Sequence, residues 1–419
     1  MPKDARAIII TASYERQIPF PAPPPGMFFF SRAPVSGKRR GGILVSPGIF
    51  PRGAGKADAG MTIPEIAALA GVSIGTVDRV LHKRGRVSGA TRAKIEAIIE
   101  RYRFTPNPIA RRLKRGRPYR FCALLPRRDQ DAGYWKQIID GIALGDAAAR
   151  PLGVETETHE YDRYNPDEAA AMVARVLSRE PDGLITAPIV TLWPLLEQVR
   201  SRRVPSVFVD SDFPEMEAVS TISQDPLRGG RLAGRLLHLF TGTRERPAAV
   251  LDVHSLDYNI IRRRDGFLGY AAERGFPAVV KEYAREEELS REEIARFLAE
   301  HPRLSGMFVT NCLAHRAARA VREIRPEKDL AIIGYDLIPG NRELLREGYI
   351  DAIISQRPEE QGRRAVENLY RHIVLEEPVE RRIDIPLDIY LRENIPENGA
   401  ESLSFDAPAG EPFFSGKTE

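Results

Sequence analysis

Basic side chains concentrate near the start of the chain, where they could bind the phosphates of a nucleic acid. Residues 61–120 carry 14 Lys and Arg against 4 Asp and Glu, a net charge of +10. Residues 1–60 add +6, so the remaining 299 residues carry −12 of the total of +4. A basic segment joined to an acidic body favours a polyanionic partner for that segment alone. A solvated basic face without a partner is the alternative that charge leaves open.

A second set of polar side chains lies where apolar runs end. Asp210, Asn311 and Asp336 each close a short run of the kind that forms a buried strand. A carboxylate accepts several hydrogen bonds, and an amide both donates and accepts, so these groups suit a ligand rich in hydroxyls. Asp336 could instead cap the helix that follows its strand.

The segment that contains these side chains alternates apolar runs with amphipathic helices over residues 118–395. This alternation predicts an α/β fold with two doubly wound lobes of parallel sheet and helices on both faces. Ligands of such folds bind beyond the carboxyl ends of the strands. The strands are expected in the runs 121–126, 183–188, 205–210, 248–253, 306–311 and 330–336. The helices are expected at 134–150, 166–179, 226–240, 260–275 and 290–301.

A small all-α head precedes this body. Thr62 followed by Glu65 is a capping box that starts a helix, which Gly71 ends. Ser73 can cap a second helix that runs through Leu81. Two short helices joined by a tight turn containing glycine are a helix-turn-helix, and a third helix is expected from Ser88 to about Tyr102.

The remaining segments divide the chain further. The head is expected to span residues 61–106, and residues 107–117 are expected to form a short, highly charged hinge helix capped by Asn107. Because such a helix is only about two turns long, it should be marginal in water, and a polyanion could stabilise it. Residues 1–60, with 9 Pro and 8 Gly, and residues 396–419 are expected to be disordered. Since Met61 opens the first patterned segment, residues 1–60 could be a start-site artefact.

The head resembles the lactose-repressor (LacI/GalR) family of transcriptional regulators. The matching residues are Thr62-Ile63-x-x-Ile66-Ala67-x-x-Ala70-Gly71-Val72-Ser73-x-x-Thr76-Val77-x-Arg79-Val80-Leu81, Val87-Ser88-x-x-Thr91-Arg92 and Pro106-Asn107-x-x-Ala110-Arg111-x-Leu113. The resemblance implies that the second helix enters the major groove of operator DNA. It also implies that the hinge helix forms on DNA, where Leu113 of both subunits wedges into the minor groove and bends the duplex.

Ten positions of the head and hinge are expected at the DNA. Arg79 could make a bidentate guanine contact, whereas Asp78 departs from the small hydroxyl residue common in the family and puts the operator sequence in doubt. Each polar residue could also be exposed and idle, and Leu113 could pack against its own domain. The ten positions are Ser73, Ile74, Gly75, Thr76, Asp78, Arg79, Asn107, Ala110, Arg111 and Leu113.

The body resembles the type I periplasmic sugar-binding proteins. The segments Asn259-x-x-x-Arg263-x-x-Gly266-Phe267, Ile333-Gly334-Tyr335-Asp336 and Ile354-Ser355-Gln356 resemble those that supply an arginine, an aspartate and a glutamine to a sugar. Arg263 could instead be surface charge, Gln356 could be structural, and the aromatic pair that follows the first strand could be core. The resemblance implies that seven residues bind the effector: Tyr134, Trp135, Asp210, Arg263, Asn311, Asp336 and Gln356.

Other classes of protein fit the sequence less well. No phosphate-binding loop, dinucleotide fingerprint or hydrolase motif is present, so the chain is not expected to be an enzyme or to hold a cofactor or metal. Cys122 and Cys312 lie in separate apolar runs, and no disulfide is expected. No run reaches membrane-spanning length, and a cytoplasmic protein is expected. A secreted sugar-binding protein is the alternative that the body alone allows.

The expected function is therefore that of a sequence-specific regulator, a repressor in the commoner case. It would bind a pseudo-palindromic operator as a homodimer, because symmetric half-sites require a symmetric protein. A small molecule bound between the two lobes would control it. A sugar is the expected effector, and a purine or another metabolite is the alternative.

Overall fold

The computed structural model describes residues 61–81, 85–102, 104, 116–213, 215–242, 246–327 and 329–396. The disorder expected at residues 1–60 and in the C-terminal tail concerns residues outside this set, apart from Pro396. The same holds for residues 107–115 of the expected hinge helix, and so for the DNA contacts expected of Asn107, Ala110, Arg111 and Leu113.

The head consists of three helices around a small apolar core. They are α1 (Ile63–Ala70), α2 (Ile74–Leu81) and α3 (Gly89–Arg101). The backbone nitrogen and the hydroxyl of Thr62 both donate to the Glu65 carboxylate, at 2.7 and 2.8 Å, which fixes the start of α1. Gly71 ends α1 at φ +69°, a conformation that favours glycine, and turns the chain into α2. The three predicted helices are confirmed. The core residues are Ile66, Ala67, Ala70, Val77, Val80 and Ile95.

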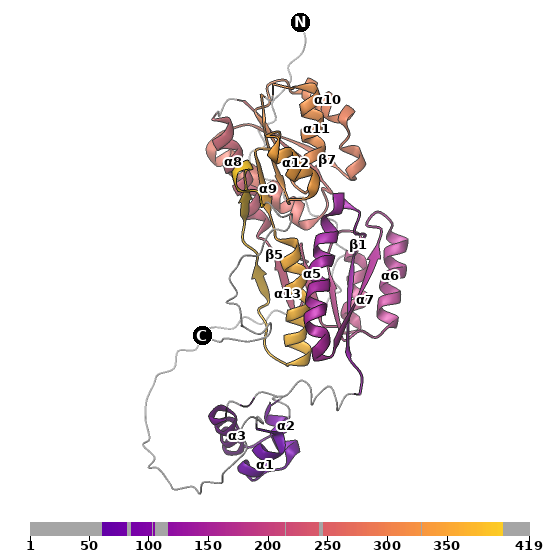
Figure 1. Cartoon of the computed structure of the whole chain (residues 1–419), viewed down its shortest axis with the longest axis vertical. Helices are drawn as coiled ribbons and strands as arrows, with labels where there is room; N and C mark the ends of the chain where they lie inside the picture. The colour runs from indigo at the N-terminus through magenta and orange to yellow at the C-terminus, as the bar shows by residue number, and fades with distance from the viewer. Residues whose placement is uncertain are drawn as a thin grey trace, which may run out of the picture.

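The body divides into two lobes that follow one another along the long axis of the molecule (Figure 1). The first lobe is built on a six-stranded sheet in the order β11-β5-β4-β3-β1-β2, in which all described pairs are parallel. Its strands are β1 (Tyr119–Pro126), β2 (Val154–Tyr161), β3 (Gly183–Thr186), β4 (Ser206–Val209), β5 (Ser220–Ser223) and β11 (Arg382–Asp384). Its helices are α5 (Tyr134–Ala149), α6 (Pro166–Ser178), α7 (Trp193–Ser201) and α13 (Pro358–Leu369).

The second lobe repeats this plan with a sheet in the order β12-β10-β9-β8-β6-β7. Only the pairing of β12 with β10 is antiparallel among the described strands. The strands are β6 (Ala248–Val253), β7 (Ala278–Tyr283), β8 (Gly306–Val309), β9 (Ala331–Tyr335), β10 (Ala352–Ser355) and β12 (Asp388–Tyr390). The helices are α8 (Pro226–Thr241), α9 (Tyr258–Arg274), α10 (Arg291–Glu300), α11 (Ala314–Ile324) and α12 (Pro339–Arg346).

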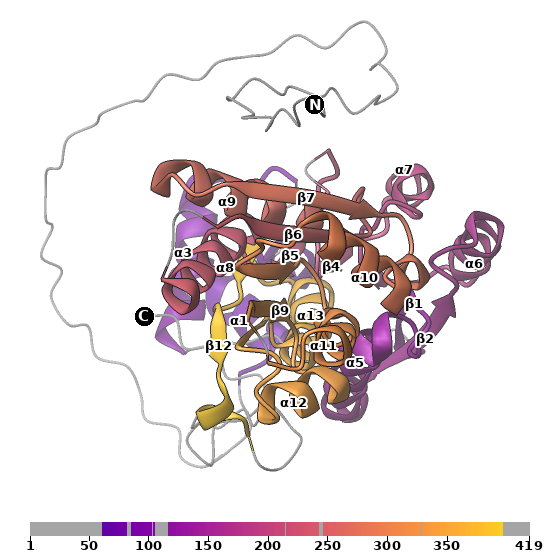
Figure 2. The same cartoon turned by 90° about the horizontal axis from the view of Figure 1, so that it is seen from above.

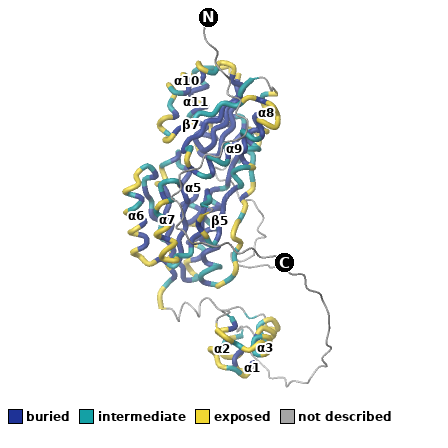
Figure 3. Tube along the Cα trace, turned by 180° about the vertical axis from the view of Figure 1, so that it is seen from behind, coloured by how far each residue is buried: buried dark blue, intermediate teal, exposed yellow. Residues whose placement is uncertain are grey.

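Alternation along the strands builds an apolar layer on each face of the second sheet. On β6, Val250 packs in a cluster with α8 and α9, whereas Leu251 packs in a cluster with α10, α11 and α12 (Figure 2). Both side chains are fully buried, as expected of a parallel sheet covered on both faces. Figure 3 shows the buried strands at the centre of each lobe and exposed residues along the outer helices. The predicted two-lobed α/β fold is confirmed.

Within the described residues the chain passes between the lobes at three points, and these three segments connect the two halves of the body. It leaves the first lobe between β5 and α8, returns between β10 and α13, and crosses again between β11 and β12. Because the connections are short, they bring the carboxyl ends of the strands of both sheets to face each other. This arrangement places the candidate site between the lobes.

Candidate effector site and DNA-reading helix

Three of the polar side chains between the lobes come directly after parallel strands. Asp210 follows β4, His254 follows β6 and Asp336 follows β9, with φ angles of +65°, +61° and +60°. A left-handed backbone conformation is uncommon for residues other than glycine and is found where structure around it enforces it. All three side chains line one cavity between the lobes.

This inner cavity brings together all the residues that the sequence predicted for the effector. The space left in it is only about 30 Å³, and side chains of the two lobes meet directly, as Asn259 does with Asp210, so the lobes lie in a closed arrangement. The seven predicted residues that line it are Tyr134, Trp135, Asp210, Arg263, Asn311, Asp336 and Gln356.

Asp210 is the centre of the contacts on the side of the first lobe. The Tyr134 hydroxyl donates to Asp210 Oδ1 at 2.6 Å, and Asn259 Nδ2, from the second lobe, donates to Oδ2 at 3.1 Å. Burial raises the pKa of Asp210, although the charge of Arg263 and the hydrogen bond from Tyr134 oppose the shift. Tyr134 therefore serves as a hydrogen-bond donor in the site as well as an apolar wall.

Arg263 is the centre of the contacts on the side of the second lobe. Its Nη1 donates to the Thr310 carbonyl and its Nη2 to Gln356 Oε1, both at 2.9 Å. Gln356 Nε2 in turn donates to Asp336 Oδ2 at 3.1 Å, so the glutamine amide bridges the arginine and the aspartate. The guanidinium also lies 3.8 Å above the centre of the Tyr335 ring. Since Arg263 is 2% exposed, the alternative that it is surface charge is wrong.

Two buried nitrogen donors on the second-lobe side of the inner cavity can still donate a hydrogen bond. Among the described residues, Arg263 Nε and Asn311 Nδ2 have no hydrogen-bond partner. An unsatisfied buried donor costs about 1–3 kcal/mol, and a ligand oxygen could remove that cost. Asp336, for its part, does not cap the following helix α12, whose N-cap is Ile338 without a side-chain hydrogen bond.

A charged cluster at the inner end of the cavity was not predicted from the sequence. Arg163 forms ion pairs with Asp131 of its own lobe and with Asp257 of the second lobe, the latter at 2.6 Å. His254 Nε2 lies 2.8 Å from Asp131 Oδ1, again across the lobes. Burial alone would raise the pKa of Asp131, but the charges of Arg163 and His254 outweigh it and lower the pKa. The cluster joins the lobes at their inner ends.

A signal for part of this cluster was present in the sequence. Arg163 lies just after β2, His254 directly after β6 and Asp131 in the loop after β1, the positions where ligands of such folds bind. Trp135 belongs to the same group, because its Nε1 donates to Asp131 Oδ2 at 2.6 Å. The indole is 2% exposed and is therefore a buried wall that orients the aspartate.

The predicted DNA-reading residues of α2 lie together on the surface of the head. Ser73, Ile74, Gly75, Asp78 and Arg79 are exposed and Thr76 is half-buried, whereas Val77 and Val80 on the opposite face are buried. Ser73 Oγ accepts from the Thr76 backbone nitrogen at 3.2 Å and so caps the helix, as predicted. Ile74 is 54% exposed, so its side chain is available for the predicted contact with a base.

Other site chemistry can be stated for the described part of the chain. There, no group of three or more His, Cys, Asp or Glu could hold a metal ion. Cys122 and Cys312 are buried free thiols. Over the same residues, every helix is too short or too polar to span a bilayer.

Comparisons with known proteins agree with this organisation. Residues 122–377 match the periplasmic binding protein domain, and residues 62–107 match the bacterial regulatory proteins of the lacI family. The chain is 27% identical over 285 residues to the HTH-type transcriptional regulator DegA of Bacillus subtilis (strain 168), covering 66% of this chain and 81% of that protein. It is 26% identical over 294 residues to the HTH-type transcriptional repressor PurR of Photorhabdus laumondii subsp. laumondii, covering 67% and 82%.

Among solved structures, the chain resembles GanP, a glucose-galactose binding protein from Geobacillus stearothermophilus. The TM-score is 0.58 and the identity 26%, over 67% of this chain and 99% of that one. Fold, site and similarity together define a DNA-binding transcriptional regulator whose effector domain has the fold of a periplasmic binding protein. The chain belongs to the LacI family of bacterial transcriptional regulators, as the sequence predicted.

Proposed function

We propose that this regulator binds a neutral sugar between its two lobes and that the sugar controls its affinity for operator DNA. The observation that carries the proposal is the convergence of the seven sequence-predicted residues on one interlobe cavity. They supply carboxylate, amide and guanidinium groups beside aromatic surface, the set that a ring of vicinal hydroxyls requires. The likeness to a glucose-galactose binding protein supports the same class of ligand.

The sugar would take over hydrogen bonds that the site now makes with itself. In the closed arrangement Gln356 forms a hydrogen bond with each of Arg263 and Asp336, and Asn259 of the second lobe donates to Asp210. A ligand hydroxyl can donate to either carboxylate and accept from Arg263 or Asn311, so it can replace these contacts group for group. A purine or another metabolite is the alternative, and the same experiment distinguishes it.

Lobe movement would reach the DNA through the first lobe. Where the chain enters the body, Arg117 Nη1 and the Arg120 backbone nitrogen both donate to Asp182 Oδ2, at 3.2 and 2.9 Å. The attachment point of the head therefore moves with the first lobe, and in a dimer a change in the angle between the lobes would change the distance between the two attachment points. We propose that the hinge segment 107–117 is the element whose folding on DNA responds, and that ligand binding weakens operator binding.

We further propose that the protein acts in the cytoplasm, on operator DNA, as a homodimer. Apolar side chains lie exposed on the outer faces of the effector domain, namely Leu144 on α5 and Leu239 and Phe240 on α8. A symmetric contact that covers them would give two heads for two operator half-sites. Light scattering on the full chain would measure the dimer's mass, and a monomeric mass at micromolar concentration would contradict it.

The experiment that tests the proposed effector uses the full chain. Thermal shift with a panel of sugars, hypoxanthine, guanine and common metabolites would identify the compound that raises the melting temperature. That compound would then be titrated against the complex with operator fragments selected from random DNA. Stabilisation by a sugar and loss of the operator complex are expected. Stabilisation by a purine alone would identify a purine, and not a sugar, as the effector. Stabilisation without any loss of the operator complex would contradict the proposed control of DNA binding.

A further inference from the structure

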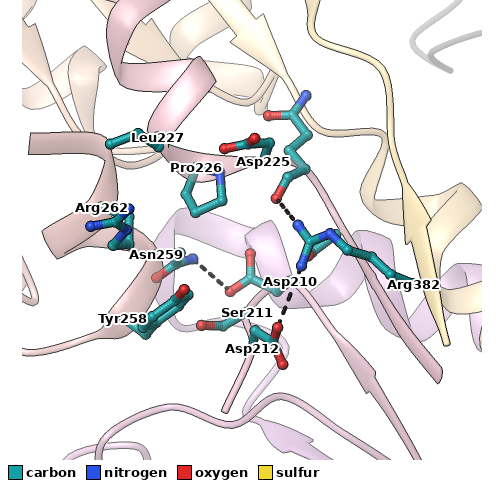
Figure 4. A pocket seen from close by; sticks show the side chains of 12 residues that line it. Asp210, Ser211, Asp212, Asp225, Pro226, Leu227, Tyr258, Asn259, Arg262 and Arg382 are labelled. Atoms are coloured by element: carbon teal, nitrogen blue, oxygen red, sulfur yellow. Dashed lines mark hydrogen bonds and ion pairs between the residues drawn. The ribbon is translucent and has the colours of Figure 1, made fainter. Parts of the chain in front are cut away.

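A second, larger cavity adjoins the inner cavity, on the side where the chain first passes from one lobe to the other, between β5 and α8. This outer cavity has a volume of about 220 Å³ and is lined by the loop after β4, the start of α8 and the start of α9 (Figure 4). Asp210 and Asn259 line both cavities. Their hydrogen bond of 3.1 Å, drawn in Figure 4, forms the partition between the two spaces.

The charged groups of the outer cavity already have partners. Arg382 donates to Asp384 at 2.6 Å and to Asp212 at 3.4 Å, and Arg262 donates to Asp265 at 3.4 Å. Asp225 accepts from the Arg228 backbone nitrogen as the N-cap of α8. A charged ligand would have to compete with these ion pairs, so the cavity favours a neutral ligand.

Two buried polar atoms of this cavity have no such partner. Ser211 and Gln224 are 1% and 2% exposed, and among the described residues Ser211 Oγ and Gln224 Oε1 make no hydrogen bond. The Gln224 amide is held in place, because its Nε2 donates to the carbonyls of Ser355 and Pro386 at 2.5 and 2.6 Å. Its Oε1 can therefore only accept, whereas the Ser211 hydroxyl can do both.

Hydroxyls of a ligand can satisfy both atoms. One hydroxyl can donate to Gln224 Oε1 and another can donate to or accept from Ser211 Oγ, whereas a carboxylate oxygen cannot donate to the glutamine. The ring of Tyr258 and the apolar surface of Pro226 lie on the same cavity and suit the C–H face of a sugar (Figure 4). The outer cavity thus offers the contacts of a sugar subsite.

We propose that the effector is a disaccharide, with one ring among Arg263, Asp336 and Asn311 and the second ring in the outer cavity against Ser211, Gln224 and Tyr258. This inference rests on the proposed function, that the cleft binds a sugar. A disaccharide spans both spaces because Asp210 and Asn259 form their common wall. The inner ring can enter once the hydrogen bond between Asp210 and Asn259 breaks and Gln356 releases Arg263 and Asp336. The outer cavity already has a volume that can hold a sugar ring.

Calorimetric titration of the full chain tests the proposal. The probes are lactose, melibiose, maltose, cellobiose, trehalose and sucrose, together with their components galactose, glucose and fructose. At least one disaccharide should bind about tenfold more tightly than either of its components, as two to three added hydrogen bonds allow. Ser211→Ala should weaken that disaccharide about fivefold and its components less than about twofold, because the hydroxyl contacts only the second ring.

Two further variants make the result interpretable. Tyr258→Ala should weaken the disaccharide selectively in the same way, and Ser201→Ala, on the exposed surface of α7, should change no affinity. Ser211→Ala should fold normally, because its hydroxyl has no partner to lose among the described residues. Melting temperatures of all variants verify this.

The alternative outcomes separate this inference from the function on which it rests. Equal affinity for a monosaccharide and its disaccharides would overturn the inference and leave the sugar-controlled regulator standing. Tight disaccharide binding that neither Ser211→Ala nor Tyr258→Ala weakens would likewise overturn it. Absence of binding by every sugar would overturn both the sugar effector and the second subsite.

Discussion

Arg163 Nη2 and Asp257 Oδ2 lie 2.6 Å apart and form a buried ion pair that joins the two lobes. The side chains come from the loop after β2 and from the N-cap of α9, and both are 5% exposed. Asp257 also accepts from the Val190 backbone nitrogen at 2.9 Å, so it binds the first lobe twice. The closed arrangement therefore has its own electrostatic contacts, which an effector must complement or displace.

Loss of this ion pair should destabilise the protein strongly. Arg163→Ala leaves the carboxylates of Asp131 and Asp257 buried without their cation, which typically costs about 3–5 kcal/mol. Urea unfolding would measure the change. Arg127→Ala is the matched control, because its ion pair with Glu168 is exposed and should be worth at most about 1 kcal/mol. Equal effects of the two variants would show that the interlobe pair adds little.

Removal of one effector carboxylate should uncouple the regulator. Asp336→Ala removes the acceptor opposite Gln356, and we expect it to abolish the response to effector. Operator binding without effector should change less than about threefold, because Asp336 lies on the ligand side of the fold. Titration of effector against the operator complex checks this with wild type as the reference. A variant that responds at the wild-type effector concentration, or that folds but no longer binds operator, would refute the assignment.

Gly230 on α8 packs directly against the backbone of Arg263 on α9. A Cβ at Gly230 would lie 1.8 Å from the Arg263 carbonyl oxygen, so Gly230→Ala must push α9 away from α8. We expect a stability loss of about 1–3 kcal/mol and a loss of effector affinity of about tenfold or more. Gly269→Ala is the control on α9, because the nearest atom to its Cβ would be 3.7 Å away. Calorimetry of both variants decides, and unchanged affinity of Gly230→Ala would contradict the packing argument.

Stability should depend on pH through Asp252, a buried residue at the end of β6. Burial raises its pKa from 3.8 to about 7, although Arg264 opposes the shift. The unfolded chain ionises this group first, so the stability that it contributes falls as the pH rises from about 4 to about 7 and then levels off. Asp252→Asn should remove this slope and stabilise the protein at pH 8 by roughly 2–4 kcal/mol. Asp265→Asn, whose side chain on α9 is 41% exposed, should leave the slope in place during urea unfolding across this range.

Base preference should depend on Arg79. Its side chain is exposed on α2, and Arg79→Ala should cost about 1–3 kcal/mol and relax selection at one operator position. Selection from random DNA followed by sequencing would measure this. Arg92→Ala on α3 should weaken binding evenly across sequences if it contacts phosphate alone. Identical operator preferences of wild type and Arg79→Ala would contradict the docking of α2.

Much of the fold was predictable because its central elements are strongly patterned. The expected helices at 134–150 and 166–179 match α5 and α6 within one residue, and the run at 248–253 is β6. The polar strand β2 was missed, because it lies at a sheet edge and carries Glu155, Glu157 and Glu160 instead of an apolar run. Strand β7 lies at the corresponding edge of the second sheet and was also missed, because its apolar run of three residues ends at Lys281 and Glu282.

The site was predictable where a residue belongs to a local motif and unpredictable where its role depends on the partner. Arg263 and Asp336 lie in segments with recognisable neighbours. The ion pair of Arg163 with Asp257 joins residues 94 positions apart, and the contact of Asp131 with His254 joins residues 123 apart. Only the closed arrangement of two lobes brings such pairs together, and no periodicity within either segment encodes it.

The left-handed backbone at Asp210 and Asp336 has a consequence for how this regulator can change its ligand over evolution. Asparagine tolerates this conformation nearly as well as aspartate, whereas β-branched residues are strained there by about 1–3 kcal/mol. One nucleotide change converts an aspartate codon into an asparagine codon. It exchanges a pure acceptor for a group that also donates, without disturbing the strand end. On the proposed function, these two codons are therefore the most accessible route to a new ligand, and paralogues should diverge there before they diverge in the strands.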